Sequence, residues 1–374
     1  MSLQLVPVLD AVKDVSGGNV KTPQKEYAEA GDYPIVDQGQ SLVGGFTDDK
    51  SRICKAEPPV IIFGDHTRAV KFIDFPFCMG ADGTKVLAPR EGHDPKYLFH
   101  AISALNLEGA GYSRHFKFLK EKRIPLPPLA DQKRVAKILD AADALRAKRR
   151  ESLAQLDALL QSAFLEMFGD PVENPKGWGR QPLAQLADHF CDGPFGSNLK
   201  SSHYVDKGVR VLRLQNIGVG DLLEDDLAFI AEDHFQSLPR NHCKPGDVII
   251  GTLGDPNLRA CVIPQYLDRA LNKADCLLFR PNPEVVLSSY VCWLLNCEAL
   301  VDSAAGLVRG QTRGRISLGR LKTLFVPVPP IRAQQNFDSA VGTIQEHKQN
   351  LKAQVAELDR LFHAVQQRAF SGNL

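Results

Sequence analysis

The same junction occurs twice in this chain, and it constrains the fold more than any other feature of the sequence. Residues 124–128 read IPLPP, and residues 326–330, at a spacing of 202 residues, read VPVPP. Proline lacks a backbone N–H and disfavours helix at the preceding residue, so each run is extended. Apolar residues after each run recur at helical spacing. The chain is therefore predicted to pass twice from a short strand into a helix.

Upstream of the two junctions, five further pairs of segments match in the same order. The pairs begin at residues 6 and 181, 31 and 207, 58 and 246, 81 and 272, and 97 and 290. A repeat of this size indicates two related globular units, each followed by a long helix. The predicted domains are 1–123 and 171–325 for the units, and 124–170 and 326–374 for the junctions with their helices.

Both helices carry a seven-residue apolar period, which is typical of a coiled coil. The period runs over residues 135–167 and 337–369; Arg146 and Arg149 interrupt it in the first helix and Lys348 in the second, with Arg146 and Lys348 at equivalent positions. A parallel pairing would bring these cations level, so we expect antiparallel helices, with long cationic side chains that reach solvent. The predicted fold class is α+β: two globular α/β units joined by two long antiparallel coiled-coil helices in a pseudo-twofold repeat.

Composition excludes several classes of protein. The chain is 44% hydrophobic and 24% charged, as expected of a folded soluble protein. Its apolar runs are too short to span a membrane, and its first residues do not resemble a signal peptide, so we predict a cytoplasmic protein without a membrane partner. The eight cysteines form no CxxC pair and are predicted to be small core residues. The net charge of +1 requires any nucleic-acid surface to be local.

Motifs of catalysis and cofactor binding are absent from the sequence. It lacks a GxGxxG turn after a strand, P-loop spacing, a GxSxG elbow and an HExxH helix, and its ten histidines do not cluster with cysteines or carboxylates. We therefore expect a chain that is not an enzyme and has no catalytic residues, no metal site and no bound cofactor.

Basic residues concentrate just before each junction. Five lysines and arginines lie between residues 112 and 123 with one acid, and five lie between residues 309 and 322 with none. Interleaved glycine and hydroxyl residues suit a close approach to phosphates, while Arg suits guanine and Asn or Gln suits adenine. A solvated face is the alternative, but recurrence at the same repeat position favours a nucleic-acid surface.

The candidate DNA-binding residues lie in loops. In the first unit they are His66, Thr67, Arg68, Ser113, Arg114, His115 and Lys117. In the second they are Ser197, Asn198, Lys200, Gln215, Asn216, Asn257, Arg259, Arg309, Gln311, Thr312, Arg313 and Arg315.

The chain resembles the DNA-specificity subunits of type I restriction–modification systems. The resemblance is carried by IPLPPLADQ from residue 124, VPVPPIRAQ from 326, GPFGSNLKSSHYVDKGVRVLRLQNIGVGDL from 193 and GDVIIGTLGD from 246. It implies that each unit is a target recognition domain for one half of a bipartite double-stranded DNA site. It also implies that the helices dock two methylation subunits and the restriction–translocation subunits. S-adenosylmethionine, ATP and Mg²⁺ would belong to those partners only.

Two other functions stay open from the residues alone. One is a coiled-coil scaffold that binds only proteins, and the other is a nuclease with an unrecognised site. A scaffold would retain no genomic DNA fragments at low salt, which separates it from a DNA reader. Because the two units differ in sequence, a reader would recognise two different half-sites, and its whole target would be asymmetric.

Overall fold

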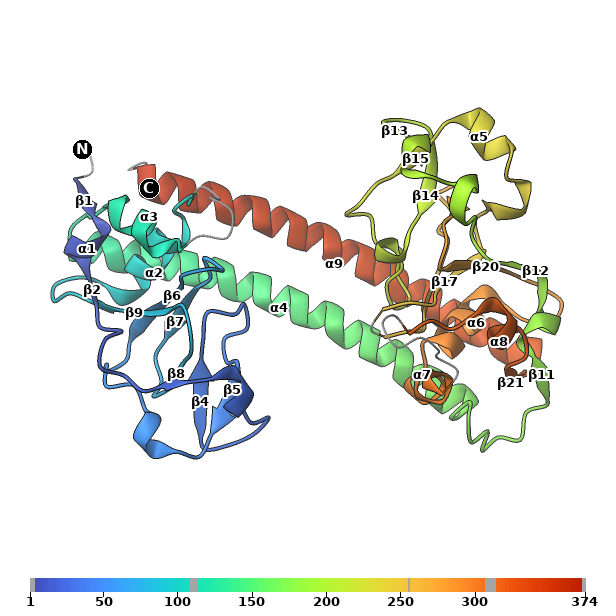
Figure 1. Ribbon diagram of the computed structural model, residues 1–374, viewed down its shortest axis with the longest axis horizontal. Coiled ribbons are helices and arrows are strands. Elements are labelled where there is room, and N and C mark those ends of the chain that lie inside the picture. The colour runs from blue at the N-terminus through green and yellow to red at the C-terminus, as the bar shows by residue number, and fades with distance from the viewer. Residues whose placement is uncertain (1–3, 108–113, 255, 307–313, 372–374) are drawn as a thin grey trace. The chain divides into compact units, whose positions relative to one another are not determined.

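The structure, a computed structural model, describes residues 4–107, 114–254, 256–306 and 314–371. Its contacts divide the chain into two compact units (Figure 1). Unit 1 comprises residues 1–151 and 352–374, and unit 2 comprises residues 152–351. Two long helices, α4 (Leu129–Phe168) and α9 (Ile331–Ser371), each contribute one segment to each unit. The four domains predicted from the sequence repeat (1–123, 124–170, 171–325 and 326–374) are defined differently from these two contact-based units. Their boundaries stay a prediction.

Unit 1 contains two four-stranded sheets. One has the order β2–β9–β6–β7 with antiparallel neighbours, and the other has the order β3–β8–β4–β5 with β8 parallel to β3 and β4. The strands are β2 (Val12–Asp14), β3 (Lys21–Thr22), β4 (Tyr33–Val36), β5 (Gly45–Thr47), β6 (Val60–Gly64), β7 (Val70–Ile73), β8 (Cys78–Gly80) and β9 (Thr84–Pro89). The helices are α1 (Val8–Ala11), α2 (Pro95–Ser103) and α3 (Phe116–Glu121).

Unit 2 contains a four-stranded sheet in the order β12–β20–β17–β18 and a five-stranded sheet in the order β13–β15–β14–β19–β16. The strands are β12 (Ala187–Cys191), β13 (Tyr204–Val205), β14 (Val209–Leu212), β15 (Phe229–Ile230), β16 (His242–Cys243), β17 (Val248–Gly251), β18 (Arg259–Val262), β19 (Ala270–Asn272) and β20 (Cys276–Pro281). The helices are α5 (Glu232–Gln236), α6 (Ser288–Leu295), α7 (Glu298–Ala305) and α8 (Leu318–Lys322).

The sheets β2–β9–β6–β7 of unit 1 and β12–β20–β17–β18 of unit 2 have the same connectivity, and predicted repeat pairs fall on corresponding elements. The pair at residues 58 and 246 lies on β6 and β17, the pair at 81 and 272 on β9 and β20, and the pair at 97 and 290 on α2 and α6. Strands β6 and β17 are buried along their whole length, which explains their nearly continuous apolar runs.

The proline-rich runs form the edge of each unit, where proline is tolerated in a sheet. Within the described residues, strand β10 (Arg123–Pro125) pairs only with β1 (Leu5–Pro7), and β21 (Phe325–Pro327) pairs only with β11 (Arg180–Pro182). Each run then passes within a few residues into a long helix, as the sequence predicts.

A buried glutamine in the first turns of each long helix shows why the junction sequence recurs. Gln132 donates through Nε2 to the carbonyl oxygen of Pro127 (2.8 Å) and accepts through Oε1 from the N–H of Asp94 (2.9 Å). Gln334 makes the same two kinds of bond in unit 2, each at 2.8 Å. Each glutamine therefore joins the proline run to the loop before α2 or α6.

Aromatic side chains fasten the helix ends to the units. In unit 2, Phe168 of α4 lies edge-on to Tyr290 (ring centroids 4.9 Å apart) and to Phe337 of α9 (5.4 Å). In unit 1, Phe370 of α9 lies edge-on to Tyr97 at 5.6 Å. The hydroxyl of Tyr97 donates to the carbonyl oxygen of Pro125 in β10 (2.8 Å), and that of Tyr290 donates to the carbonyl oxygen of Pro327 in β21 (2.7 Å).

The helix segments inside unit 2 run antiparallel. Lys348 of α9 meets Asp157 of α4, whereas Phe337, earlier on α9, meets Phe164, later on α4. The residues of the predicted seam are buried or half-buried wherever they fall in the described chain. This is the narrow apolar face that a paired helix requires.

The two equivalent cations that interrupt the seam, Arg146 and Lys348, are paired with aspartates. In unit 1, Arg146 Nε lies 2.6 Å from Asp359 Oδ1. In unit 2, Lys348 Nζ contacts Asp157 Oδ1 and lies 2.7 Å from Asp221 Oδ2. Lys348 is only 1% exposed, so the expectation that it reaches solvent is wrong; its carboxylate partners compensate its charge inside the protein.

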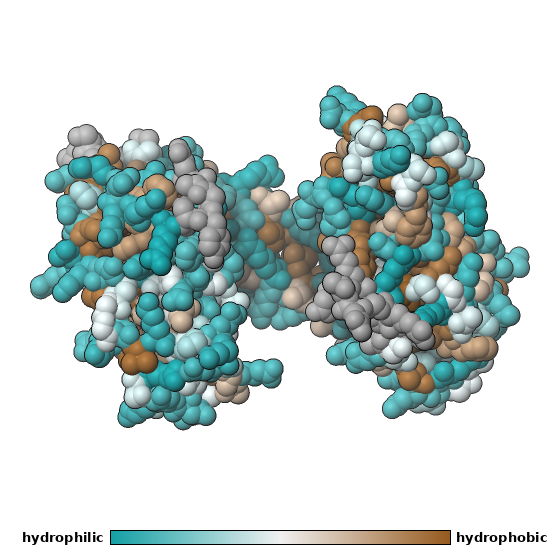
Figure 2. Space-filling model, viewed as in Figure 1, coloured by the Kyte–Doolittle hydropathy of each residue, from teal (hydrophilic) through white to brown (hydrophobic). Residues whose placement is uncertain are grey.

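The surface and the cysteines agree with the composition. All eight cysteines are buried and free, as predicted for core residues. In the view of Figure 2 the exposed side chains are mostly hydrophilic, with apolar residues in scattered patches. None of the helices in the described ranges combines the length and apolarity that crossing a bilayer requires.

Candidate nucleic-acid interface

In unit 1 the predicted residues gather on the loop that joins β6 to β7. The N–H of His66 donates to Gln38 Oε1 (3.1 Å), and the hydroxyl of Thr67 donates to the carbonyl of Gln38, so the loop is fastened to the end of β4. Arg68 adopts a left-handed backbone conformation (φ 62°), and its guanidinium donates to the carbonyl of Leu107 (2.9 Å). Thr67 and Arg68 are exposed.

The segment before α3 lies against the same loop. The N–H of His115 donates to the carbonyl oxygen of Asp65 (2.7 Å), and the N–H of Phe116 donates to the Asp65 carboxylate (2.8 Å). Arg114 is exposed, whereas His115 is only 3% exposed, so a base contact by His115 would require its side chain to move. Ser113 lies outside the described residues.

Lysines surround this loop cluster. Lys85 and Lys120 lie 5.0 and 4.9 Å from the ring centre of Phe116, and Lys117 lies 4.7 Å from that of Phe118. Sequence reasoning had no means to join Lys85 to this group, because it stands alone on β9. The result is a local concentration of positive charge beside exposed polar loop residues, which suits a phosphate backbone.

In unit 2 the predicted residues surround the loop after β17. Leu253 in that loop pairs with Arg315, and its carbonyl accepts from Arg259 (3.0 Å). Asn257 lies in the same loop, with its amide against the carbonyl oxygens of Gly254 and Gly314. Three predicted residues, Ser197, Asn198 and Lys200, form a separate exposed segment after β12.

One of the predicted residues, Arg259, makes hydrogen bonds that hold the fold together. The guanidinium of Arg259 donates to four backbone carbonyls, those of Leu214, Ile217, Leu253 and Pro256, at 2.7 to 3.0 Å. Five N–H groups in a fixed fork serve such a cage well, and they leave little of the side chain for a base edge. Arg259 therefore holds the loop in shape, and its role as a base contact stays a prediction.

Gln215 and Asn216, which follow β14, differ in exposure: the fold uses Asn216, and Gln215 faces solvent. Asn216 is fully buried, accepts from the N–H of Arg213 (2.9 Å) and donates to the carbonyls of Leu223 and Asp226 (3.1 and 2.8 Å). Gln215 is exposed and bonds to the Asp226 carboxylate. Of this pair, Gln215 is therefore the side chain that a DNA base could reach without unfolding the turn.

Arg315 is half-buried between two acids. It lies 3.3 Å from Asp192 and 3.0 Å from Asp275, and it stacks over the ring of Phe195 at 4.9 Å. Burial raises the pKa of Asp192, and the charge of Arg315 opposes that rise. The four other residues predicted near this position, Arg309, Gln311, Thr312 and Arg313, lie outside the described residues.

Sequence reasoning missed an aromatic site on the five-stranded sheet. Arg213 and Lys273 lie 6.0 and 5.3 Å from the ring centre of Tyr204. An aromatic ring with two cations is typical of single-base stacking or phosphate contact. No sequence signal could have found it, because the three residues belong to three different segments. Among the described residues, no group of three or more His, Cys, Asp or Glu side chains could hold a metal ion.

Two α/β units with basic, amide-bearing loops are typical of a protein that recognises nucleic acid. Residues 11–156 match the family model for the type I restriction modification DNA specificity domain. The type I restriction enzyme MjaVIII specificity subunit of Methanocaldococcus jannaschii is 22% identical over 284 residues, covering 70% of this chain and 67% of that protein. The type I restriction enzyme EcoR124I/EcoR124II specificity subunit of Escherichia coli is 28% identical over 351 residues, covering 86% and 83%.

Two solved structures are similar in fold. The S subunit of a type I restriction–modification system from M. genitalium has a TM-score of 0.55 at 16% identity, covering 99% of this chain and 96% of that one. A chain from a study of complex assembly and conformational transition of the type I system has a TM-score of 0.51 at 19% identity, covering 100% and 98%.

These comparisons confirm the resemblance inferred from the sequence: the chain is similar to the DNA-specificity subunits of type I restriction–modification systems, and residues 11–156 match their DNA specificity domain. The prediction that the chain is not an enzyme agrees with this similarity to specificity subunits.

Proposed function

We propose that this chain reads an asymmetric, bipartite site in double-stranded DNA, with the loops of each unit contacting one half-site. The observation that carries the proposal is the duplication of the reading surface. In each unit the candidate residues surround the loop after a fully buried central strand, β6 or β17. The loop sequences differ, DHTRA after β6 and TLGDPNL after β17, so the two half-sites differ as well.

The two long helices hold the readers apart and dock two methylation subunits and the restriction–translocation subunits. A pseudo-twofold relation between the two halves is supported by the seam ion pairs, because Arg146 and Lys348, and likewise Asp157 and Asp359, are each 202 residues apart. Large apolar side chains that remain exposed along the helices suit subunit docking. They are Leu129, Ile138, Leu145, Leu159, Leu165 and Leu361.

The proposal assigns S-adenosylmethionine, ATP and Mg²⁺ to the partner subunits and no cofactor to this chain. The cytoplasm is the proposed location, because the chain's DNA target and its partners would be there. The target recognition domains in this scheme are residues 1–123 and 171–325.

A matched insertion tests the proposal. One heptad is added to α4 after Glu151 and one to α9 after Leu351, where the contacts of the two units meet. Seven residues preserve the seam register and lengthen each helix by about 10 Å. The gap between the half-sites should then grow by about three base pairs, at about 3.4 Å per pair.

The measurement is methylation mapping in a genome that carries the variant with its partner subunits. The same two half-sites should reappear with a longer spacer, at reduced affinity because DNA twists as the gap grows. Altered half-site bases with an unchanged spacer would contradict the proposal. Insertion into α4 alone is the control, since it shifts Asp157 and Phe164 away from their α9 partners and should abolish methylation.

A further inference from the structure

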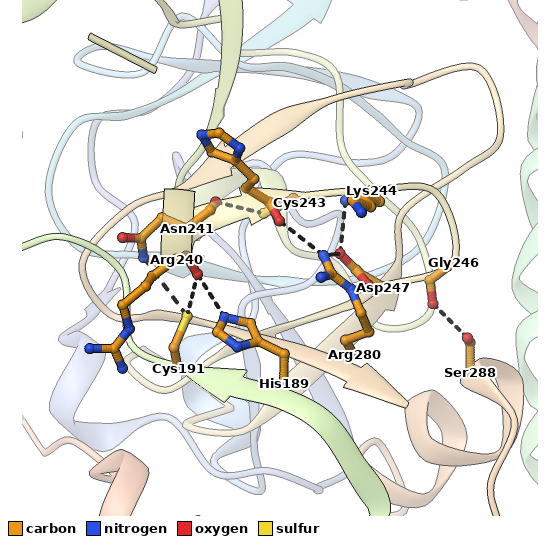
Figure 3. A network of polar contacts seen from close by, with 11 residues as sticks. His189, Cys191, Arg240, Asn241, Cys243, Lys244, Gly246, Asp247, Arg280 and Ser288 are labelled. Carbon is orange, nitrogen blue, oxygen red and sulfur yellow. Dashed lines mark hydrogen bonds and ion pairs between the residues drawn. The ribbon is translucent and has the colours of Figure 1, made fainter. Parts of the chain in front are cut away.

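A second basic feature of unit 2 lies away from the loop after β17. It is a surface groove of about 410 Å³ lined by His189, Pro239, Arg240, His242, Lys244 and Arg280 (Figure 3). Strands β12 and β20 supply one wall, and the 3-10 helix Pro239–Asn241 with the turn after β16 supplies the other. None of these residues belongs to the basic patches that the sequence shows before the junctions.

The groove is built on a fixed backbone. The carbonyl oxygen of Arg240 accepts from His189 Nε2 (2.7 Å) and from the thiol of Cys191 (3.1 Å). A carbonyl only accepts, so His189 carries a proton on Nε2. The side-chain amide of Asn241 donates to the carbonyl of Asp192 (2.8 Å). These bonds hold the backbone of Arg240 against β12, while its guanidinium points away from that network (Figure 3).

One cation of the groove is neutralised and two are not. Arg280 binds the buried Asp247 through two parallel bonds of 2.8 Å, and Asp247 also accepts from the backbone N–H of Lys244 (2.8 Å). The side chains of Arg240 and Lys244 are exposed and have no acidic partner among the described residues. The groove therefore carries about two uncompensated positive charges.

The corresponding place in unit 1 shares only part of this property, because Lys55, which follows Cys54 as Lys244 follows Cys243, is exposed and has no acidic partner among the described residues. Arg52 ends a 3-10 helix before β6, as Arg240 lies in the 3-10 helix before β17. Arg52 is paired with Glu26 at 2.8 Å and with Asp49 at 3.0 Å. The uncompensated arginine is thus a feature of unit 2, whereas the exposed lysine recurs in both units.

Positive charges from the groove and from the candidate interface act on two adjacent residues at the end of β12, Cys191 and Asp192. Burial raises the pKa of Cys191 to about 11, and the charges of Arg240 and Lys322 oppose that rise. The charges of Lys322 and Arg315 likewise oppose the rise in the pKa of Asp192. The geometry agrees along β12, because Lys322 lies 5.8 Å from the ring centre of Phe190 and Arg315 lies 3.3 Å from Asp192.

We propose that this groove is a phosphate site for the DNA backbone, in which the Arg240 guanidinium and the Lys244 ammonium contact phosphates flanking the half-site that unit 2 reads. The inference rests on the proposed DNA-reading function. Arg280, held by Asp247, forms a rigid wall, and the free cations supply the charge. Phosphate contacts fix position and carry no sequence information, so the groove contributes affinity and register rather than base selectivity.

The test is salt-dependent binding of the full-length chain to two duplexes, one containing the mapped target and one with its half-sites scrambled. The variant is Arg240→Gln with Lys244→Gln. Each lost phosphate contact should reduce the slope of log affinity against log salt by about 0.9 and weaken binding about tenfold at 0.1 M salt. Both duplexes should be affected equally. Arg52→Gln is the matched control and should leave the slope unchanged, because its charge is already neutralised.

The charge-conserving variant Arg240→Lys with Lys244→Arg should keep the wild-type slope, which excludes a merely structural effect. If the wild-type chain binds DNA but the Gln variant has the same slope, the groove proposal is wrong and the DNA-reading function stands. A wild-type chain that binds neither duplex would overturn the DNA-reading function. Loss of selectivity at an unchanged slope would assign the groove to base contact. Micromolar binding of inorganic phosphate, lost in the Gln variant, would assign it to a free anion instead of DNA.

Discussion

Replacing Lys348 with alanine should destabilise unit 2 far more than the same change at Arg146 destabilises unit 1. Lys348 is 1% exposed and Asp221 is 19% exposed, so removing the lysine takes a charge partner from a mostly buried carboxylate, whereas Asp157, at 46% exposed, can turn to water. Removing one partner of a buried ion pair costs about 3–5 kcal/mol. Arg146 is 13% exposed and its partner Asp359 is 33% exposed, so water replaces the pair at a cost of about 1 kcal/mol.

The pH dependence follows from the pKa of Lys348. Burial lowers this pKa, but hydrogen bonds to Asp157 and Asp221 outweigh burial and hold it above its usual value of 10.5. A cation with a raised folded-state pKa stabilises the fold at all pH values below its unfolded-state pKa, and this contribution disappears as pH rises through the folded-state value. The difference between wild type and variant should therefore be constant from about pH 6 to about pH 9 and shrink only above about pH 10.5.

Tryptophan fluorescence in urea gives the measurement, because both tryptophans, Trp178 and Trp293, belong to unit 2. Trp293 is 2% exposed and touches the turn at Gly220, next to Asp221. With a urea dependence of about 2 kcal/mol per M, the midpoint should fall by about 1.5–2.5 M. The fluorescence midpoint of Arg146→Ala should be nearly unchanged.

A shift below about 0.5 M for Lys348→Ala would refute the reasoning, since it would mean that water enters the site freely. The triple variant Lys348→Met, Asp157→Leu, Asp221→Leu separates loss of charge pairing from loss of packing. Because all three charges are removed together, it should recover most of the lost stability.

Two further predictions concern the interface and the chemistry. Arg259→Ala should destabilise unit 2 by about 2–3 kcal/mol in the same fluorescence assay, because four backbone carbonyls lose their donor; lost target selectivity with full stability would instead make Arg259 a base contact. Purified chain incubated with plasmid, magnesium and labelled S-adenosylmethionine should neither transfer label nor cut DNA, and either activity would reveal a catalytic site that the sequence does not disclose.

Much of the fold could be predicted because its signals are local. Proline runs fix the short edge strands, and the seven-residue period fixes the two helices, whose observed bounds begin at Leu129 and Ile331. The five matched segment pairs indicate the repeated strands because buried strands must be apolar whatever their partners are. Such features depend on neighbours within a few residues, which a single sequence displays directly.

The site could be predicted only in part, because its chemistry depends on partners that are distant in sequence. Lys348 pairs with Asp221 across 127 residues, and no pattern links the two. Arg259 and Asn216 have the right chemistry for reading bases, but nearby backbone groups occupy them. The groove at Arg240 joins segments whose cations are individually ordinary. The net positive charge of the groove can be inferred only from the structure, in which Asp247 neutralises Arg280 but no acid pairs with Arg240 among the described residues.

The division of the long helices between the units has a consequence for how the protein is made. Residues 152–351 are contiguous, so unit 2 can form as soon as they have left the ribosome. Unit 1 begins to be synthesised first, yet Phe362 and Phe370, which pack against His100 and Tyr97, are among the last residues to emerge. The half that is translated first is therefore the half that is finished last. A chain whose synthesis stops early would display the uncovered apolar surface of unit 1 to chaperones and proteases.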